Sequence, residues 1–300
     1  MTSTWSSSVD KKLSLLRNVP NSLKGALSRV WQQHYEELYE PEAEGTTSLQ
    51  AGLDDILSSF QSNNPTLSHL RYVWMALILA SVVEPTVKYY QPDNSIPEEV
   101  INRLSLWLIE NLAKLKLLDC KVQFYKAAEE EQENSIMDAF RLFTETNKIP
   151  SFQVLYEALD VYINAIKALD PNQSLEALLD ILDDCLEGYA NFPGSYGRRE
   201  LFDWWLLDVV PASWYLVPPS SIYSINELAH EKYITSRQIE KLEKISSAMW
   251  AIILAASEGN KEMDRLAFRN TFDSSLNKIE TDVKIGGNQF IIDRIESRYK

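Results

Sequence analysis

Hydrophobic residues recur along most of this chain at intervals of three or four positions, the spacing of one face of an α-helix. Leu175, Leu178, Leu182 and Leu186, for example, form a single stripe. Prolines mark several of the boundaries, because proline cannot donate a backbone hydrogen bond inside a helix. Pro85 predicts a kink or stop, and Pro211 predicts a break or kink. The pattern predicts helices at about residues 9–16, 23–38, 49–60, 67–90, 95–118, 135–147, 151–169, 174–190, 198–210, 236–259 and 261–280.

The spacing predicts an all-α fold, an irregular multi-helix bundle of about ten helices. Only nine glycines occur in 300 residues, whereas β-rich and dinucleotide-binding folds need glycine at turns and phosphate loops. We divide the chain into an N-terminal helical part, 1–150, and a C-terminal helical part, 151–300, which can also form one continuous domain. The tail "TDVKIGGNQFIIDRIES" either forms a short hairpin or breaks a helix, and we favour the break because a lone hairpin is marginally stable.

The apolar segments and the cysteines indicate a cytoplasmic protein with no membrane span. The longest apolar run, "VWMALILASVV" at 73–83, is shorter than the roughly 20 residues that cross a bilayer, so it predicts a buried core helix. Cys120 and Cys185 lie in apolar helical contexts and form no metal or disulfide motif. The Ser-rich, basic start resembles an organelle transit peptide, but we favour an ordinary amphipathic first helix.

The charge of the chain is strongly negative and unevenly distributed. The formal net charge is −14, residues 31–60 contain seven acids and no Lys or Arg, and residues 121–190 contain fourteen acids against five bases. Such a chain repels the nucleic-acid backbone. We therefore expect a protein partner, with a basic surface as one candidate, and no direct nucleic-acid binding.

The stretch "NFPGSYGRRELFDWWLLDVVPASWYLVPPSS" at 191–221 combines glycine turns, paired arginines and three tryptophans. A turn that leads into a helix presents free backbone N–H groups, and two arginines beside it add donors for an anionic group. We expect both arginines in the first turn of the 198–210 helix, at least partly exposed. The alternative is that the arginines pair internally, with Asp203 or Asp184. For the aromatic residues we favour core packing over a binding surface. Any binding site is placed at Tyr196, Arg198, Arg199, Trp204, Trp214 and Tyr215.

A carboxylate motif in the 174–190 segment offers a metal-site candidate. Asp183, Asp184 and Glu187 resemble the DDxxE form of the aspartate-rich motif of class I isoprenoid synthases. The resemblance implies carboxylates that bridge Mg²⁺ ions to a diphosphate. The second metal motif of that family is absent, so we favour solvated acids beside an apolar helix face and expect no bound metal.

These observations favour a soluble, acidic interaction protein: an adaptor, assembly factor, regulator or immunity-type inhibitor that acts through protein–protein contacts. No nucleotide-binding loop or nucleophile elbow occurs, so no cofactor is expected and an enzyme is the less favoured interpretation. The alternative is a helical-bundle enzyme or small-molecule binder with a Trp-lined pocket, isoprenoid-synthase-like and Mg²⁺-dependent. The direction in which Asp183, Asp184 and Glu187 point separates the two hypotheses.

Overall fold

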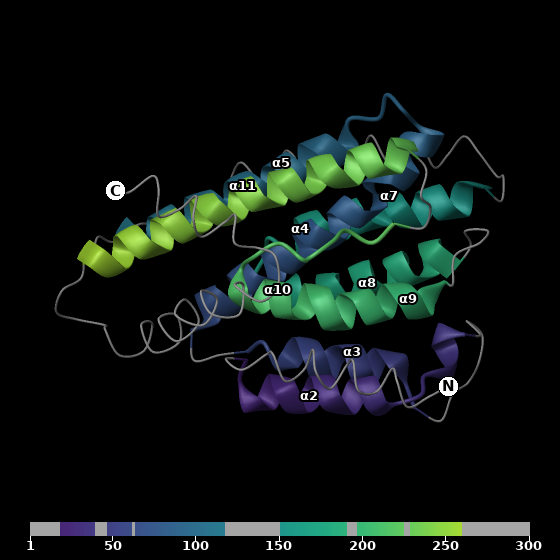
Figure 1. Cartoon of the computed structure of the whole chain (residues 1–300), viewed down its shortest axis with the longest axis horizontal. Coiled ribbons are helices and arrows are strands. Elements are labelled where there is room, and N and C mark those ends of the chain that lie inside the picture. The colour runs from purple at the N-terminus through teal and green to yellow at the C-terminus, as the bar shows by residue number, and fades with distance from the viewer. Residues whose placement is uncertain are drawn as a thin grey trace.

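The computed structural model describes residues 19–39, 47–61, 64–117, 151–190, 197–224 and 229–259. Within these ranges the secondary structure consists of helices and the turns between them, with no strand (Figure 1). The all-α prediction is therefore confirmed. The helices predicted at 9–16, 135–147 and 261–280 and the tail hairpin lie outside the described residues. The elements are α2 (Asn21–Gln32), η1 (Glu36–Leu38), α3 (Leu49–Ser58), α4 (Pro65–Tyr90), α5 (Ile96–Leu117), α7 (Ser151–Lys167), α8 (Ser174–Ala190), α9 (Arg198–Trp204), η2 (Trp205–Val209), α10 (Val210–Tyr215) and α11 (Ala229–Gly259).

Helix α4 forms the centre of the bundle, in contact with α5, α7, α8, α10 and α11. It begins where the Asn64 side chain accepts a hydrogen bond from the Leu67 N–H, with Pro65 in its first turn. The helix does not stop at Pro85 and continues to Tyr90, the end predicted for it. By length and composition α4 could cross a membrane, yet 89% of its apolar window is buried inside this fold, as in a core helix.

Helices α7 and α8 form an antiparallel hairpin that packs on α4 (Figure 1). The turn between them is held by Asp170, whose side chain accepts hydrogen bonds from the Asn172 N–H at 2.8 Å and from Gln173 Nε2 at 3.0 Å. Both helices match their predicted ranges closely. Their apolar stripes lie in the core, which leaves a polar stripe on each helix along the outer side of the hairpin.

The segment after Gly197 is one helix with a wide turn in its middle, running through α9, the π-helical η2 and α10. We predicted that Pro211 would break or kink the helix expected at 198–210. The π-helical turn ends at Val209, two residues before Pro211. It shifts the backbone hydrogen-bond pattern, so the missing N–H of Pro211 does not end the helix.

The C-terminus of α10 is held by its own backbone and by two other helices. Leu216 adopts a left-handed conformation (φ 55°), and the N–H of Val217 donates to the carbonyl of Ala212. Three side chains then donate to carbonyls at this end. They are Arg71 Nε to Trp214 (3.0 Å), Trp74 Nε1 to Val217 (2.9 Å) and Ser246 Oγ to Leu216 (2.8 Å).

Helix α11 is longer than the sequence predicts. We expected a boundary near Thr235 or Ser236, but one helix runs from Ala229 to Gly259. Packing overrides the capping signals there, because Gln238 is buried and donates to Glu84 of α4 at 2.8 Å. Arg237 forms an ion pair with the same carboxylate.

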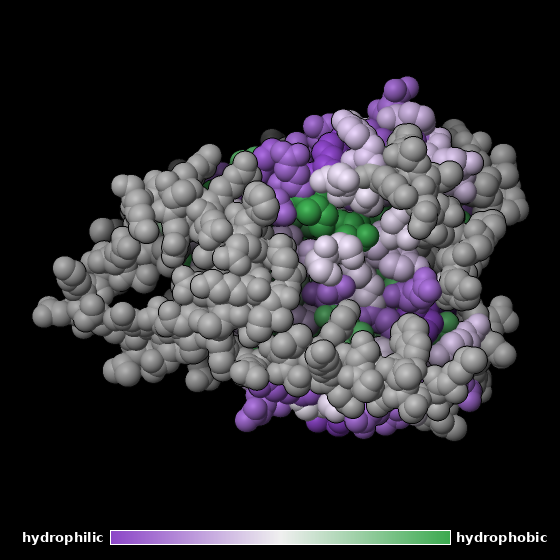
Figure 2. All heavy atoms as spheres, in the orientation of Figure 1, coloured by the Kyte–Doolittle hydropathy of each residue, from purple (hydrophilic) through white to green (hydrophobic). Residues whose placement is uncertain are grey.

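Helices α2 and α3 form a layer at the N-terminal end of the bundle (Figure 1). The helix predicted at 23–38 ends earlier, at Gln32, and is followed by the separate short turn η1. Buried residues from both predicted parts, 1–150 and 151–300, belong to one continuous core cluster. On the face shown in Figure 2, hydrophobic residues reach the described surface only in small patches.

Candidate functional site

The arginine pair at 198–199 begins α9, as predicted, but Arg198 is not exposed. Its side chain is 6% exposed and forms an ion pair with Glu187 of α8. Its Nη1 donates to the Glu37 carbonyl at 2.9 Å. The prediction that both arginines are at least partly exposed is therefore wrong for Arg198. Two acceptors from other parts of the chain, the Glu37 carbonyl and the Glu187 carboxylate, hold the guanidinium in its buried position.

Arg199 has an internal partner as well. It is half-buried and its Nε lies 2.9 Å from Asp203 Oδ1, one helical turn later. Its guanidinium lies over the ring of Trp31, 5.2 Å from the ring centre. The internal-pairing alternative thus describes both arginines. Asp203 is one of the two acids considered, while the partner of Arg198 is Glu187 rather than Asp184.

The predicted aromatic binding residues lie largely inside the protein. Trp204 is 8% exposed and its Nε1 donates to the Ser221 carbonyl at 2.8 Å. Trp214 is 5% exposed and packs against Phe60. Tyr215 is half-buried, and Tyr196 lies outside the described residues. The tryptophan side chains fill the core in this fold, so a role for them in binding stays a prediction without exposed surface behind it.

Sequence reasoning missed Arg71, a buried cation in the middle of the apolar helix α4. The residue is 2% exposed, and its guanidinium carbon lies 3.4 Å from the centre of the Trp214 ring. Desolvation lowers the pKa of Arg71 to about 9. Its Nε bond to the Trp214 carbonyl places it at the negative end of the 198–215 helix, which offsets part of the cost of burying the charge. The sequence signal that could have identified it is a single arginine within the apolar segment "HLRYVWMALIL".

Negative charge concentrates on the outer side of the α7–α8 hairpin. Residues 151–190 contain eight carboxylates and one lysine. The polar stripes of the two helices lie next to each other on this side. A hydrogen bond joins them, from Nδ2 of the buried Asn164 on α7 to Asp184 Oδ2 on α8, at 3.0 Å. We use the name acidic face for the carboxylates of these stripes, Glu157, Asp160, Asp180, Asp183 and Asp184.

The acidic face perturbs the titration of its own members. Burial raises the pKa of Asp184 to about 8, with a further contribution from the negative charge of Asp160. Burial also raises the pKa of Asp160 and of Glu157, and Asp160 adds to the shift of Glu157. Tyr156, 45% exposed, lies beside Asp160, whose charge raises the pKa of the phenol. These groups therefore behave as one electrostatic cluster.

The three acids of the isoprenoid-synthase-like motif are not arranged as a metal site. Asp183 is exposed, Asp184 is turned toward Asn164, and Glu187 is paired with Arg198. In the part of the chain that the structure describes, no group of three His, Cys, Asp or Glu side chains has the geometry of a metal site. The Mg²⁺-dependent hypothesis gains no support from this arrangement.

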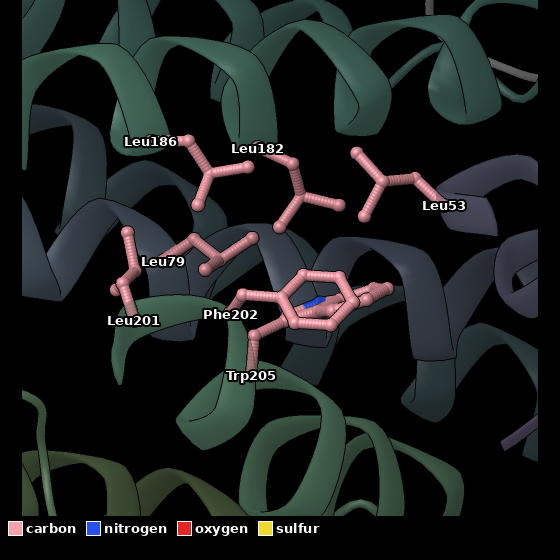
Figure 3. Close-up of a pocket in the computed structure, with 7 residues that line it drawn as sticks. All are labelled: Leu53, Leu79, Leu182, Leu186, Leu201, Phe202 and Trp205. Atoms are coloured by element: carbon pink, nitrogen blue, oxygen red, sulfur yellow. The ribbon is translucent and has the colours of Figure 1, made fainter. Parts of the chain in front are cut away.

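A small apolar cavity lies among α3, α4, α8, α9 and η2 (Figure 3). Leu182 and Leu186 of α8 point into it. It leaves about 10 Å³ for the centre of a water molecule, the lower limit for one water. Although Trp205 is part of its lining, the cavity is too small to be the ligand pocket of the alternative hypothesis. Its lining is Leu53, Leu79, Leu182, Leu186, Leu201, Phe202 and Trp205.

Comparison with known proteins gives no family to which these features can be referred. No family model matches the sequence, and neither the curated proteins nor the solved structures gave a match.

Proposed function

We propose that this protein is an interaction protein that binds the basic surface of a protein partner through the acidic face of α7 and α8. The observation that supports this most directly is the concentration of carboxylates on the hairpin, eight acids against one lysine in forty residues. A surface of one charge sign steers an oppositely charged partner and raises its association rate.

The two stripes offer an extended surface rather than a point contact. Asp180 and Asp183 are exposed on α8, and Tyr156 is exposed on α7. Aromatic residues, and tyrosine in particular, are enriched in protein interfaces because they combine contact area with a polar end. A lysine- or arginine-rich helix or loop is the partner chemistry that this surface fits.

The proposal is tested with a synthetic lysine-rich peptide as probe and two charge-matched variants. Asp180→Asn/Asp183→Asn removes two exposed charges from the acidic face, whereas Asp93→Asn/Glu110→Gln removes two exposed charges elsewhere. We expect about tenfold weaker binding for the first variant and less than about twofold for the second.

Salt gives an independent measurement of the same property. Affinity for the peptide should fall steeply between 0.05 and 0.5 M salt, because screening shortens the range of attraction between exposed charges to well below about 10 Å. Binding that is unchanged at 0.5 M salt, or equally weakened by both variants, would contradict the proposal.

A further inference from the structure

We propose that an arginine-bearing protein partner docks on four exposed tyrosines at the end of the bundle where α4 ends and α7 and α11 begin. The basic character of this partner rests on the proposed function, whereas the tyrosines are placed by the fold. We use the name tyrosine surface for these residues, Tyr89, Tyr90, Tyr156 and Tyr233.

Antiparallel packing brings α4 and α7 to a common end. Near the start of α4, His69 Nε2 lies 2.9 Å from the carbonyl of Ala168, which directly follows α7. Tyr89 and Tyr90 are the last two residues of α4, and Tyr156 lies in the second turn of α7. These three tyrosines therefore lie toward the same end of the α4–α7 pair.

Helix α11 is antiparallel to α4 as well, and it begins at this end (Figure 1). Gln238 of α11 donates to Glu84 of α4 at 2.8 Å. Further along α11, Ser246 donates to the end of α10 that Trp74 of α4 also contacts. Tyr233 precedes Gln238 by little more than one helical turn, which places it beyond Glu84 in the direction of the C-terminus of α4.

The four side chains are turned toward solvent. Tyr89 is 74% exposed, Tyr233 71%, Tyr156 45% and Tyr90 36%. They make up four of the six large hydrophobic side chains that are exposed in the part of the chain that the structure describes. Single exposed aromatic residues are common, but a group of them at one end of a fold is typical of a protein interface.

The tyrosine pair at the end of α4 is held in a defined arrangement. The rings of Tyr89 and Tyr90 meet edge to face, with 5.1 Å between their centres. In the loop that follows, Lys88 Nζ donates to the carbonyls of Pro92 and Asn94 at 3.1 and 2.8 Å, so its charge is engaged within the loop. A surface that is ordered before binding loses less conformational entropy when a partner docks.

The carboxylates beside the tyrosine surface favour a cationic partner. Glu98 and Glu99 are exposed in the first turn of α5, directly after that loop, and Glu157 follows Tyr156. A guanidinium group stacks on an aromatic face and donates to a carboxylate through a planar fork, whereas an ammonium group has no planar face. The surface therefore fits arginine better than lysine. Because Glu157 also belongs to the acidic face, one partner can contact both surfaces.

Isothermal titration calorimetry of the full chain with decaarginine and decalysine, two peptides of equal length and charge, tests the inference. We expect the arginine peptide to bind about tenfold more tightly than the lysine peptide. Tyr89→Ala/Tyr233→Ala should remove most of this preference by weakening the binding of the arginine peptide. Tyr89→Phe/Tyr233→Phe, which keeps both rings, should retain the preference. The control Tyr39→Ala, at a side chain that is 56% exposed beside η1, should retain it as well.

Equal affinity for the two peptides, or an unchanged preference in Tyr89→Ala/Tyr233→Ala, would overturn the inference. If Asp180→Asn/Asp183→Asn then still weakens both peptides, the proposed function is supported without the tyrosine surface. If Tyr89→Ala/Tyr233→Ala weakens the arginine peptide while Asp180→Asn/Asp183→Asn weakens neither, the result supports the tyrosine surface and contradicts the proposed function. Sedimentation of the protein alone tests a second copy as the occupant, and a dimer that Tyr89→Ala/Tyr233→Ala dissociates would overturn the choice of an arginine-bearing partner.

Discussion

The arginines at the start of α9 and the carboxylates of the α7–α8 hairpin both concentrate one sign of charge, yet the fold surrounds them differently. Arg198 and Arg199 each lie against an acid, Glu187 and Asp203. Asp184 lies among Asp160, Glu157 and Asp183, and no basic residue contributes to its pKa, whereas Asp160 also feels the charge of Lys167. A charge that meets its opposite inside the fold contributes to stability, whereas charges that meet their own sign remain available to an external partner.

The largest effect should come from Trp214, which we predicted as a candidate binding residue and found in the core. Trp214→Ala removes a buried ring and should lower the free energy of unfolding by about 3–5 kcal/mol, as measured by urea denaturation. Tyr233→Ala, at a side chain that is 71% exposed, serves as control and should change it by less than about 0.5 kcal/mol. If Trp214→Ala has near-normal stability and loses peptide binding, Trp214 is a binding residue rather than a core residue.

The arginine pair should divide into one strong and one weak contributor. Arg198→Met removes hydrogen bonds to Glu37 and Glu187 from a buried position and should cost about 2–3 kcal/mol. Arg199→Met breaks a half-buried pair one turn apart and should cost about 0.5–1 kcal/mol. Both variants are measured by the same urea denaturation. Equal losses in the free energy of unfolding would show that the deeper burial of Arg198 does not make it the larger contributor.

Two groups should give the pH dependence of stability opposite signs. Stability should be lost at high pH through Asp184, whose pKa is raised to about 8 in the folded protein, and at low pH through His69. His69 of α4 is buried, its Nε2 lies 2.9 Å from the Ala168 carbonyl, and desolvation lowers the pKa of His69. The unfolded state therefore binds more protons below about pH 6.5, so stability falls as the medium becomes more acidic. His69→Gln should reduce the loss between pH 7 and pH 5, as measured by thermal unfolding. If His69→Gln leaves the acid side of the profile unchanged, the charge of His69 is not its cause.

The smallest effect should come from the exposed acids. Asp180→Asn/Asp183→Asn relieves repulsion among like charges, so stability should be unchanged or higher by up to about 0.5 kcal/mol. Asp93→Asn/Glu110→Gln should leave stability within the same margin, which makes the pair a matched control. A clear loss of stability in the hairpin variant would mean that these carboxylates have internal partners, as the arginines do.

Local patterns were sufficient to predict most helix positions, including the two helices that form the α7–α8 hairpin. The helix predicted at 174–190 is α8, because its leucine stripe is regular and Pro171 precedes it. The helix predicted at 67–90 is α4, which begins two residues earlier, at Pro65. Where packing decides, local signals failed. The capping residues Thr235 and Ser236 lie inside α11, and Pro85 lies inside α4.

The candidate site was harder to predict because its partners are distant in sequence. Arg198 donates to the carbonyl of Glu37, 161 positions away, and no spacing rule encodes that contact. Burial raises the pKa of Asp184, and the charge of Asp160 on the neighbouring helix adds to this shift. Sequence reasoning identified the acid-rich segments by composition, but only the register between α7 and α8 shows which acids face each other.

The three side chains that donate to the end of α10 have a consequence for how the protein unfolds. Arg71 and Trp74 come from α4, and Ser246 comes from α11. The Leu216 and Val217 amides bond back to Ser213 and Ala212 within the same turn, so they become available for hydrogen exchange only when that turn opens. Opening it breaks the bonds to α4 and α11 together. The end of α10 and these two helices therefore form one cooperative unit, whose slowest amides exchange at a common rate.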